Sequence, residues 1–198
     1  MILTTIGGVI TLTATAITAA ALIYLHVVPS GLGWRNPVSQ FGITRYRVGY
    51  RIAAMAAAAA AVGAILALLD RPGFIVTVAL LALFAVARFL IPFVPMDAPG
   101  SPTTTSGRWH NVLAFVAFGS VTAAAFTAGG LLHDTGSAQA ASLSTVLACV
   151  MAVGAVLLLL SRVRTTWSGI FGIGERIIYL GFIAWFTIIG LTALGVVH

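Results

Sequence analysis

The stretch from Ile52 to Leu69, IAAMAAAAAAVGAILALL, decides the fold because it contains no charged and no polar side chain. About 20 apolar residues in a helix are long enough to cross the hydrocarbon core of a bilayer. The alanines from Ala56 to Ala61, followed by Gly63, allow neighbouring backbones to approach closely in lipid. We therefore predict a central membrane-spanning helix here, packed on both sides.

The same composition extends over the whole chain, which is 60% hydrophobic and only 7% charged. The mean hydropathy is +1.10, and a soluble bundle of such helices would have almost no polar surface. The six apolar runs that could cross a membrane lie at roughly 3–28, 48–69, 73–95, 110–132, 140–161 and 175–197. The predicted fold class is an all-α integral membrane protein, a single six-transmembrane-helix bundle over residues 1–198.

Several other classes of protein are excluded by the composition. The segment from Met1 to Ala20 has no Lys or Arg at its start, so we interpret it as the first membrane helix and not as a signal peptide. Cys149 is the single cysteine, which excludes an intrachain disulfide and a cysteine zinc site, and we expect it to be a small buried hydrophobe. No basic run is interleaved with aromatic residues, so the net charge of +6 does not indicate nucleic-acid binding.

The few charged residues are unevenly distributed between the two ends of the expected bundle. Nine of the ten arginines lie in or beside the first, third and fifth gaps between the apolar runs. An excess of arginine on short loops marks the cytoplasmic side of a membrane. Loops 1, 3 and 5 are therefore predicted to be cytoplasmic and both termini outward. The absence of lysine and the heavy use of Ala, Gly, Thr and Arg suggest a GC-rich bacterial genome, and hence a bacterial plasma membrane.

Residues that could take part in catalysis lie at the same predicted cytoplasmic side of the bundle. Asp97 and Glu175 follow the third run and open the sixth, and His110 opens the fourth. Carboxyl groups and an imidazole can transfer protons, so these three are the catalytic candidates. The residues expected to bind the substrate, through an anionic group or beside it, are Arg51, Arg88, Arg176, Tyr179, His26, Ser39 and Asn36.

Arg88 lies inside the third apolar run, and placing an arginine within the membrane is energetically unfavourable. Three interpretations stay open: the side chain reaches back to the interface, it pairs with Asp97 or Glu175, or it binds a ligand anion. Glu175 and Tyr179 are one turn apart and share a face, whereas Arg176 points elsewhere.

The predicted function is an integral-membrane enzyme that acts on a lipid or isoprenoid-like substrate by acid–base chemistry, through cyclisation, isomerisation or hydrolysis. The competing class is a non-catalytic lipid-binding, transport or scaffolding protein whose arginines and carboxylates form a structural network. No cofactor is predicted. A metal or haem held by His26 and His110 is a weaker alternative, as is a Ser39–His110–Asp97 triad. Spacings such as Gly49/Ala53 permit a homo-oligomer and serve packing within one chain equally well.

Short motifs at the ends of the apolar runs carry a family resemblance. They are Asn36-Pro-Val-Ser39 with Gly42, then Pro95-Met96-Asp97 with Gly107 and His110, and finally Gly174-Glu175-Arg176. In these motifs the whole chain resembles the six-helix bacterial and archaeal membrane proteins of domain of unknown function family 998. The resemblance implies a six-helix bundle with its shared polar residues on one face, and it implies no established activity.

Overall fold

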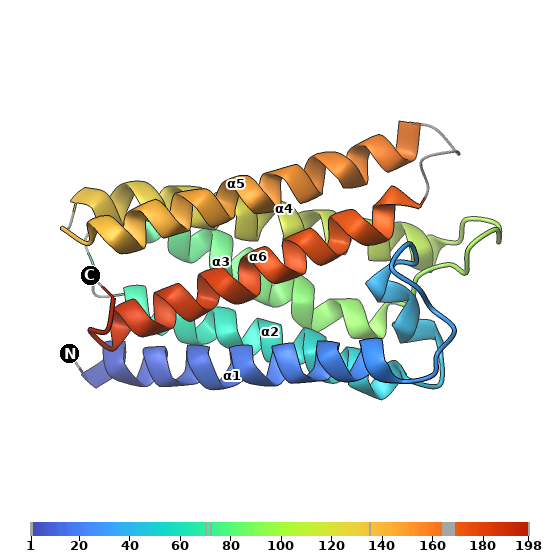
Figure 1. Ribbon diagram of the computed structural model, residues 1–198, viewed down its shortest axis with the longest axis horizontal. Coiled ribbons are helices and arrows are strands. Elements are labelled where there is room, and N and C mark those ends of the chain that lie inside the picture. The colour runs from blue at the N-terminus through green and yellow to red at the C-terminus, as the bar shows by residue number, and fades with distance from the viewer. Residues whose placement is uncertain (1, 70, 72, 135, 164–168, 198) are drawn as a thin grey trace.

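Six long helices run side by side along the molecule in the computed structural model, which describes residues 2–69, 71, 73–134, 136–163 and 169–197 (Figure 1). They are α1 (Ile2–Val27), α2 (Arg47–Leu68), α3 (Ile75–Leu90), α4 (Thr105–Asp134), α5 (Ala138–Val163) and α6 (Ile170–Ala193), with the short 3-10 helices η1 (Val38–Ile43) and η2 (Ile91–Phe93) between them. Each long helix, with η2 continuing α3, is long and apolar enough to cross a membrane. The predicted fold class, a multi-pass bundle of six helices, is confirmed.

The helices form a closed ring because each packs against the next in the chain and α6 packs back against α1. The alanine-rich α2 packs against α1 on one side and α3 on the other, and it also touches α6. A Cβ atom at Gly63 would meet the Thr11 amide nitrogen at 2.6 Å, so the backbones of α1 and α2 approach as closely as glycine allows. The prediction of a helix packed on both sides is confirmed.

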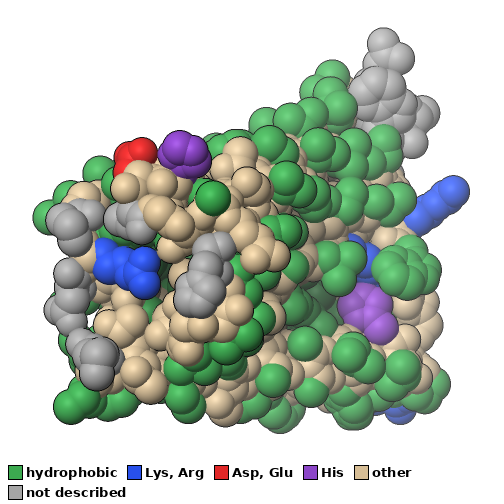
Figure 2. Space-filling model, turned by 60° about the vertical axis from the view of Figure 1, so that its left-hand side comes forward, with side chains coloured by type: hydrophobic (Ala, Val, Ile, Leu, Met, Phe, Trp, Pro, Cys, Tyr) green, Lys and Arg blue, Asp and Glu red, His purple; other side chains and the backbone are tan. Residues whose placement is uncertain are grey.

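Helix α5 lies at the edge of the bundle, and it is the least buried of the six spans. Its Cys149 is exposed, so the prediction that this thiol is buried is wrong. The reason is that α5 is apolar around its whole circumference, and the sequence does not show which side faces the protein. Hydrophobic side chains also cover the flank of the bundle in Figure 2, where the few charged side chains in view lie towards its ends.

The two ends of the bundle differ in structure. Helix α1 begins and α6 ends at one end, whereas the long segments before α2 and α4 lie together at the other (Figure 1). The first of these segments, residues 28–46, contains η1, in which Val38 and Phe41 are buried. This segment therefore caps the bundle, and we call it the capping loop. Helices α4 and α6 each begin five residues before their predicted starts, at Thr105 and Ile170. Glu175 therefore lies inside α6 and not at its first turn.

Candidate functional site

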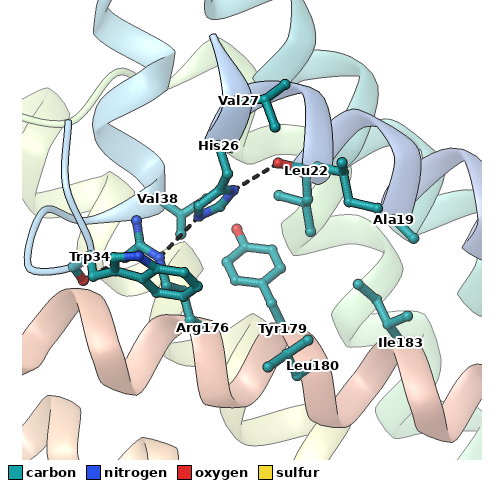
Figure 3. A pocket seen from close by; sticks show the side chains of 11 residues that line it. Ala19, Leu22, His26, Val27, Trp34, Val38, Arg176, Tyr179, Leu180 and Ile183 are labelled. Atoms are coloured by element: carbon teal, nitrogen blue, oxygen red, sulfur yellow. Dashed lines mark hydrogen bonds between the residues drawn. The ribbon is translucent and has the colours of Figure 1, made fainter. Parts of the chain in front are cut away.

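The capping loop is held in place by Arg176 of α6, which is 6% exposed. Its Nε donates to the His26 Nε2 at 3.0 Å, and its guanidinium lies 5.3 Å from the centre of the Trp34 ring (Figure 3). The terminal nitrogens donate to four backbone carbonyls, those of Gly33 (3.2 Å), Trp34 (2.9 Å), Asn36 (2.8 Å) and Gly172 (2.8 Å). Because these donors are used within the protein, we assign Arg176 to anchoring the loop.

His26 completes this anchor. Its Nδ1 donates to the Leu22 carbonyl oxygen at 2.7 Å, so in the neutral ring Nε2 carries the lone pair that accepts from Arg176. Both ring nitrogens are therefore engaged by the protein. No group of three His, Cys, Asp or Glu side chains suited to a metal occurs in the described ranges. In this arrangement His26 presents no free ring nitrogen to a metal or haem.

Glu175, one position earlier in α6, points to the interior and is 2% exposed. Its carboxylate accepts a hydrogen bond from the backbone amide of Val38, the first residue of η1. The first amides of a helix have no partner within it, and a carboxylate there is favourable. Glu175 therefore fixes the position of η1, and it also lines the neighbouring pocket.

Arg88 is the most unusual residue of the bundle because its guanidinium is 1% exposed and only partly bonded. Its Nη1 donates to the Tyr179 hydroxyl at 2.9 Å, and the guanidinium lies 5.1 Å from the centre of that ring. Nε and Nη2 have no hydrogen-bond partner in the described part of the chain. The guanidinium therefore neither reaches the interface nor is satisfied within the bundle.

The ion pair predicted between Arg88 and Asp97 or Glu175 is not formed. Over the described ranges, the one ion pair joins His133 and Asp134, which end α4 at the opposite end of the bundle. The interpretation of Arg88 as an interfacial residue is wrong as well, because its side chain is buried. Of the three interpretations, a ligand anion is the one that the geometry leaves open.

Asp97 lies in the loop before α4. Its carboxylate accepts from the Thr104 hydroxyl (2.6 Å) and the Thr104 amide (3.0 Å), and these hydrogen bonds lower the pKa of Asp97. The carboxylate occupies the space that a side chain at Gly107 would need. Asp97 thus closes the loop onto the start of α4, and the Ser39–His110–Asp97 triad is not formed.

His110 is the imidazole best placed for chemistry. It is 4% exposed, and its Nδ1 donates to the Val94 carbonyl oxygen at 2.7 Å. A carbonyl can only accept, so the neutral ring carries its lone pair on Nε2. His110 also lines the pocket that Glu175 lines. A histidine oriented in this way, with Nε2 free to accept, has the form of a general base.

This polar pocket has a volume of about 450 Å³ and lies where the capping loop meets the ends of α4, α5 and α6. Two exposed arginines, Arg35 and Arg162, line it, and Arg162 donates to the Asn111 side-chain oxygen at 3.1 Å. Its inner polar residues are Asn36, Ser39, His110, Ser161 and Glu175. Of the predicted site residues, the pocket therefore unites Asn36, Ser39, His110 and Glu175.

An apolar side groove of about 140 Å³ lies between α4 and α5 and adjoins the polar pocket. The two cavities share Asn111, Ala114, Arg162 and Phe171. The groove is lined further along by Phe115, Phe118, Gly119, Ala155, Leu158 and Leu159. One wall of this groove is therefore formed by α5, the least buried of the six spans.

A second apolar groove, of about 320 Å³, lies between α1 and α6 on the side of the Arg176 anchor (Figure 3). Tyr179 lines it, and Figure 3 shows the Tyr179 ring extending from α6 into the space between the two helices. The hydroxyl of Tyr179 is the group that accepts from Arg88. Two buried residues of α6 thus line different cavities, Tyr179 this groove and Glu175 the polar pocket.

The predicted site residues thus lie in several separate places, and Arg51 lies apart from the rest. Arg51 is exposed on α2 and lines neither cavity of the polar site. One buried residue, Tyr50, was missed; its ring packs so closely on Gly42 that a Cβ atom there would meet it at 2.9 Å. A sequence signal for it exists, because Tyr50, Ala53, Ala54 and Ala57 follow helical spacing along one face of α2, and all four are buried.

Six membrane-spanning helices, closed at one end by a loop over a buried polar cluster, define a multi-pass membrane protein with a site at one face. The family described as Protein of unknown function (DUF998) matches residues 12–192, so the chain belongs to this family. The match includes all the motifs at the ends of the apolar runs. No curated protein and no solved structure matches the chain.

Proposed function

We propose that this protein is a membrane enzyme that transfers protons to and from the head group of a membrane lipid, either an acyl or an isoprenoid lipid. The observation that supports this most is that the apolar side groove adjoins the polar pocket, with four lining residues in common. A ligand that fills both needs a polar end of moderate size and a narrow apolar chain, which is the chemistry of a lipid.

His110 acts as the general base in this proposal. Its lone pair on Nε2 accepts a proton from a head-group hydroxyl or from water, while the Val94 carbonyl holds the ring in position. Glu175 lies in the same pocket as the second proton-transfer group, and Ser39 offers a hydroxyl nucleophile for hydrolysis. Asp97, predicted as an acid–base residue, has no part in this mechanism because its carboxylate is bound to Thr104.

We further propose that the loop end of the bundle faces the cytoplasm of a bacterium. Arg35, Arg45, Arg47 and Arg162 are exposed at this end, and such an excess of arginine marks the cytoplasmic side. The head group is then drawn from the inner leaflet. A reporter fused to the C-terminal end is expected to score as external, and a cytoplasmic score would reverse the orientation.

The experiment that tests the enzyme follows lipid composition by mass spectrometry in nanodiscs made with a bacterial polar lipid extract. Wild-type protein is expected to convert one lipid species, and His110→Gln is expected to lose this turnover while unfolding at an unchanged temperature. The non-catalytic alternative, a lipid-binding protein, predicts no change in any species with either protein.

The side groove can be tested separately with two glycines of α4. A Cβ atom at Gly119, in the groove, or at Gly130, outside it, would meet no atom within 4 Å. Gly119→Leu therefore fills the groove without disturbing the bundle, and Gly130→Leu is its matched control. We expect turnover to fall with Gly119→Leu alone. Equal turnover in both variants would show that the groove holds no part of the substrate.

A further inference from the structure

Two arginines line the polar pocket without a role in the proposed proton transfer. Arg35 belongs to the capping loop and Arg162 to the last turn of α5, so they reach the pocket from two separate elements. Both side chains pack against the start of α6. A Cβ atom at Gly169 would meet the Cδ atom of Arg35 at 3.1 Å, and the Arg162 guanidinium lies 5.0 Å from the centre of the Phe171 ring. The fold therefore brings both arginines to one part of the pocket.

The protein uses few of the hydrogen-bond donors of these two arginines. A guanidinium group carries five N–H donors. In the described part of the chain, the one hydrogen bond of Arg162 goes to the Asn111 side-chain oxygen, and the guanidinium of Arg35 makes none. Neither arginine has an ion-pair partner there. Arg176, by contrast, donates to the carbonyls that hold the capping loop. Arg35 and Arg162 therefore keep donors for a ligand.

The charge and shape of the pocket favour one kind of ligand group. Glu175 is the one acidic residue among the described residues that line it, and its carboxylate accepts from the Val38 amide. Two guanidinium groups against one carboxylate favour an anion. A carboxylate has two oxygens in one plane, which suit a single guanidinium group. Two guanidinium groups from separate elements suit the several oxygens of a phosphate group.

The position of Arg162 shows where on the ligand this anionic group lies. Arg162 and Asn111 line both the polar pocket and the apolar side groove. The guanidinium that Asn111 orients therefore lies where the two cavities adjoin. A ligand whose apolar chain fills the groove passes this guanidinium with the first polar group after the chain.

We propose that the lipid carries a phosphate group joined directly to its apolar chain, and that Arg35 and Arg162 bind this phosphate where the polar pocket adjoins the side groove. This inference rests on the proposed function and names the chemical class of its ligand. The rest of the head group extends to His110 and Ser39, which line the same pocket.

The test measures the binding of four probes to the detergent-purified full-length protein by titration calorimetry: dodecyl phosphate, dodecanoate, dodecanol and inorganic phosphate. Wild type is expected to bind dodecyl phosphate about tenfold more tightly than dodecanol, since two exposed ion pairs are together worth about this ratio. The double variant Arg35→Gln with Arg162→Gln should lose this preference.

The matched control is Arg47→Gln with Arg51→Gln. It removes two exposed arginines at the start of α2, at the same end of the bundle, and neither of them lines the two cavities. The control should keep the tenfold preference. An equal loss in both double variants would show a general attraction of anions to this end and would overturn the site. If the first double variant fails to fold, each of its single variants should lose about threefold of the preference.

The other outcomes separate the phosphate from the proposed function. Equal binding of dodecyl phosphate and dodecanol by wild type would overturn the phosphate and leave the lipid site intact. Dodecanoate bound as tightly as dodecyl phosphate would replace the phosphate by a carboxylate. Inorganic phosphate bound as tightly as dodecyl phosphate would make the ligand a free anion and overturn the attached chain. Absence of binding by all four probes would overturn the proposed function too.

Discussion

Replacing Arg88 and its hydrogen-bond partner together, as Arg88→Met with Tyr179→Phe, is expected to stabilise the ligand-free protein. The double variant removes two buried nitrogens whose N–H groups have no acceptor in the described structure, and it leaves no orphaned hydroxyl behind. An interaction network built from these residues would predict the opposite sign. The experiment therefore separates a ligand site from a structural one.

The magnitude follows from the contacts. The change loses one charge-assisted hydrogen bond, worth about 1.5–3 kcal/mol, and one cation–π contact of about 1–2 kcal/mol. The change also removes two unfavourable contributions. The two unbonded nitrogens destabilise the protein by about 1–3 kcal/mol each, and the burial of the charge destabilises it by several kcal/mol. Replacing buried charged groups by apolar ones is neutral or stabilising by about 1–4 kcal/mol. We expect a gain within that range, and a smaller one for Arg88→Met alone.

The assay is thermal unfolding in detergent after removal of bound lipid, where 1 kcal/mol corresponds to about 2–4 °C for a chain of this size. Because Arg88 also attracts Glu175, the comparison is repeated in a Glu175→Gln background, where the gain should be larger. Arg51→Met is the control at an exposed position. A midpoint lower than that of the parent by more than about 5 °C in both backgrounds would refute the reasoning.

Three further predictions concern the loop end. Arg176→Gln removes five hydrogen bonds and should cost about 3 kcal/mol or more, detected as faster proteolysis of the loop that it anchors. The hydrogen bonds from Thr104 lower the pKa of Asp97, so the Asp97 carboxylate stabilises the fold above about pH 4, and this stabilisation is lost as the pH falls through the folded-state pKa. Amide hydrogen exchange at Thr104 should accelerate over that fall in pH. Asp97→Asn should abolish the pH dependence of this exchange. Gly107→Ala should lower the unfolding temperature because its methyl group displaces the Asp97 carboxylate, whereas Gly119→Ala, in open space, should not.

The membrane helices could be predicted from the sequence because hydropathy is a local property of the chain. The apolar stretch from Ile52 to Leu69 predicts its own helix, and alternate loops of a bundle must meet at one end. The shared face of Glu175 and Tyr179, and the different direction of Arg176, follow from helical spacing. That all three are buried, and that Arg176 and Tyr179 line the same groove, does not follow from that spacing.

The partners of the polar residues could not be predicted in the same way. Asp97 and Glu175 are equal candidates for Arg88 in the sequence, yet one is bound to Thr104 and the other to the Val38 amide. These choices depend on how loops fold over the bundle end, and short polar motifs do not contain that information. The prediction of burial is wrong for a related reason in α5, because Cys149 lies on a helix that is apolar on every side.

The central claim, a lipid whose head group lies in the polar pocket and whose chain lies in the side groove, is tested most directly by native mass spectrometry. Wild type, Gly119→Leu and Gly130→Leu are purified identically and released from detergent, and the mass of any bound small molecule is recorded. We predict that wild type and Gly130→Leu retain a lipid, and that Gly119→Leu loses it. Equal retention by all three proteins, or no bound molecule in wild type, would contradict the account.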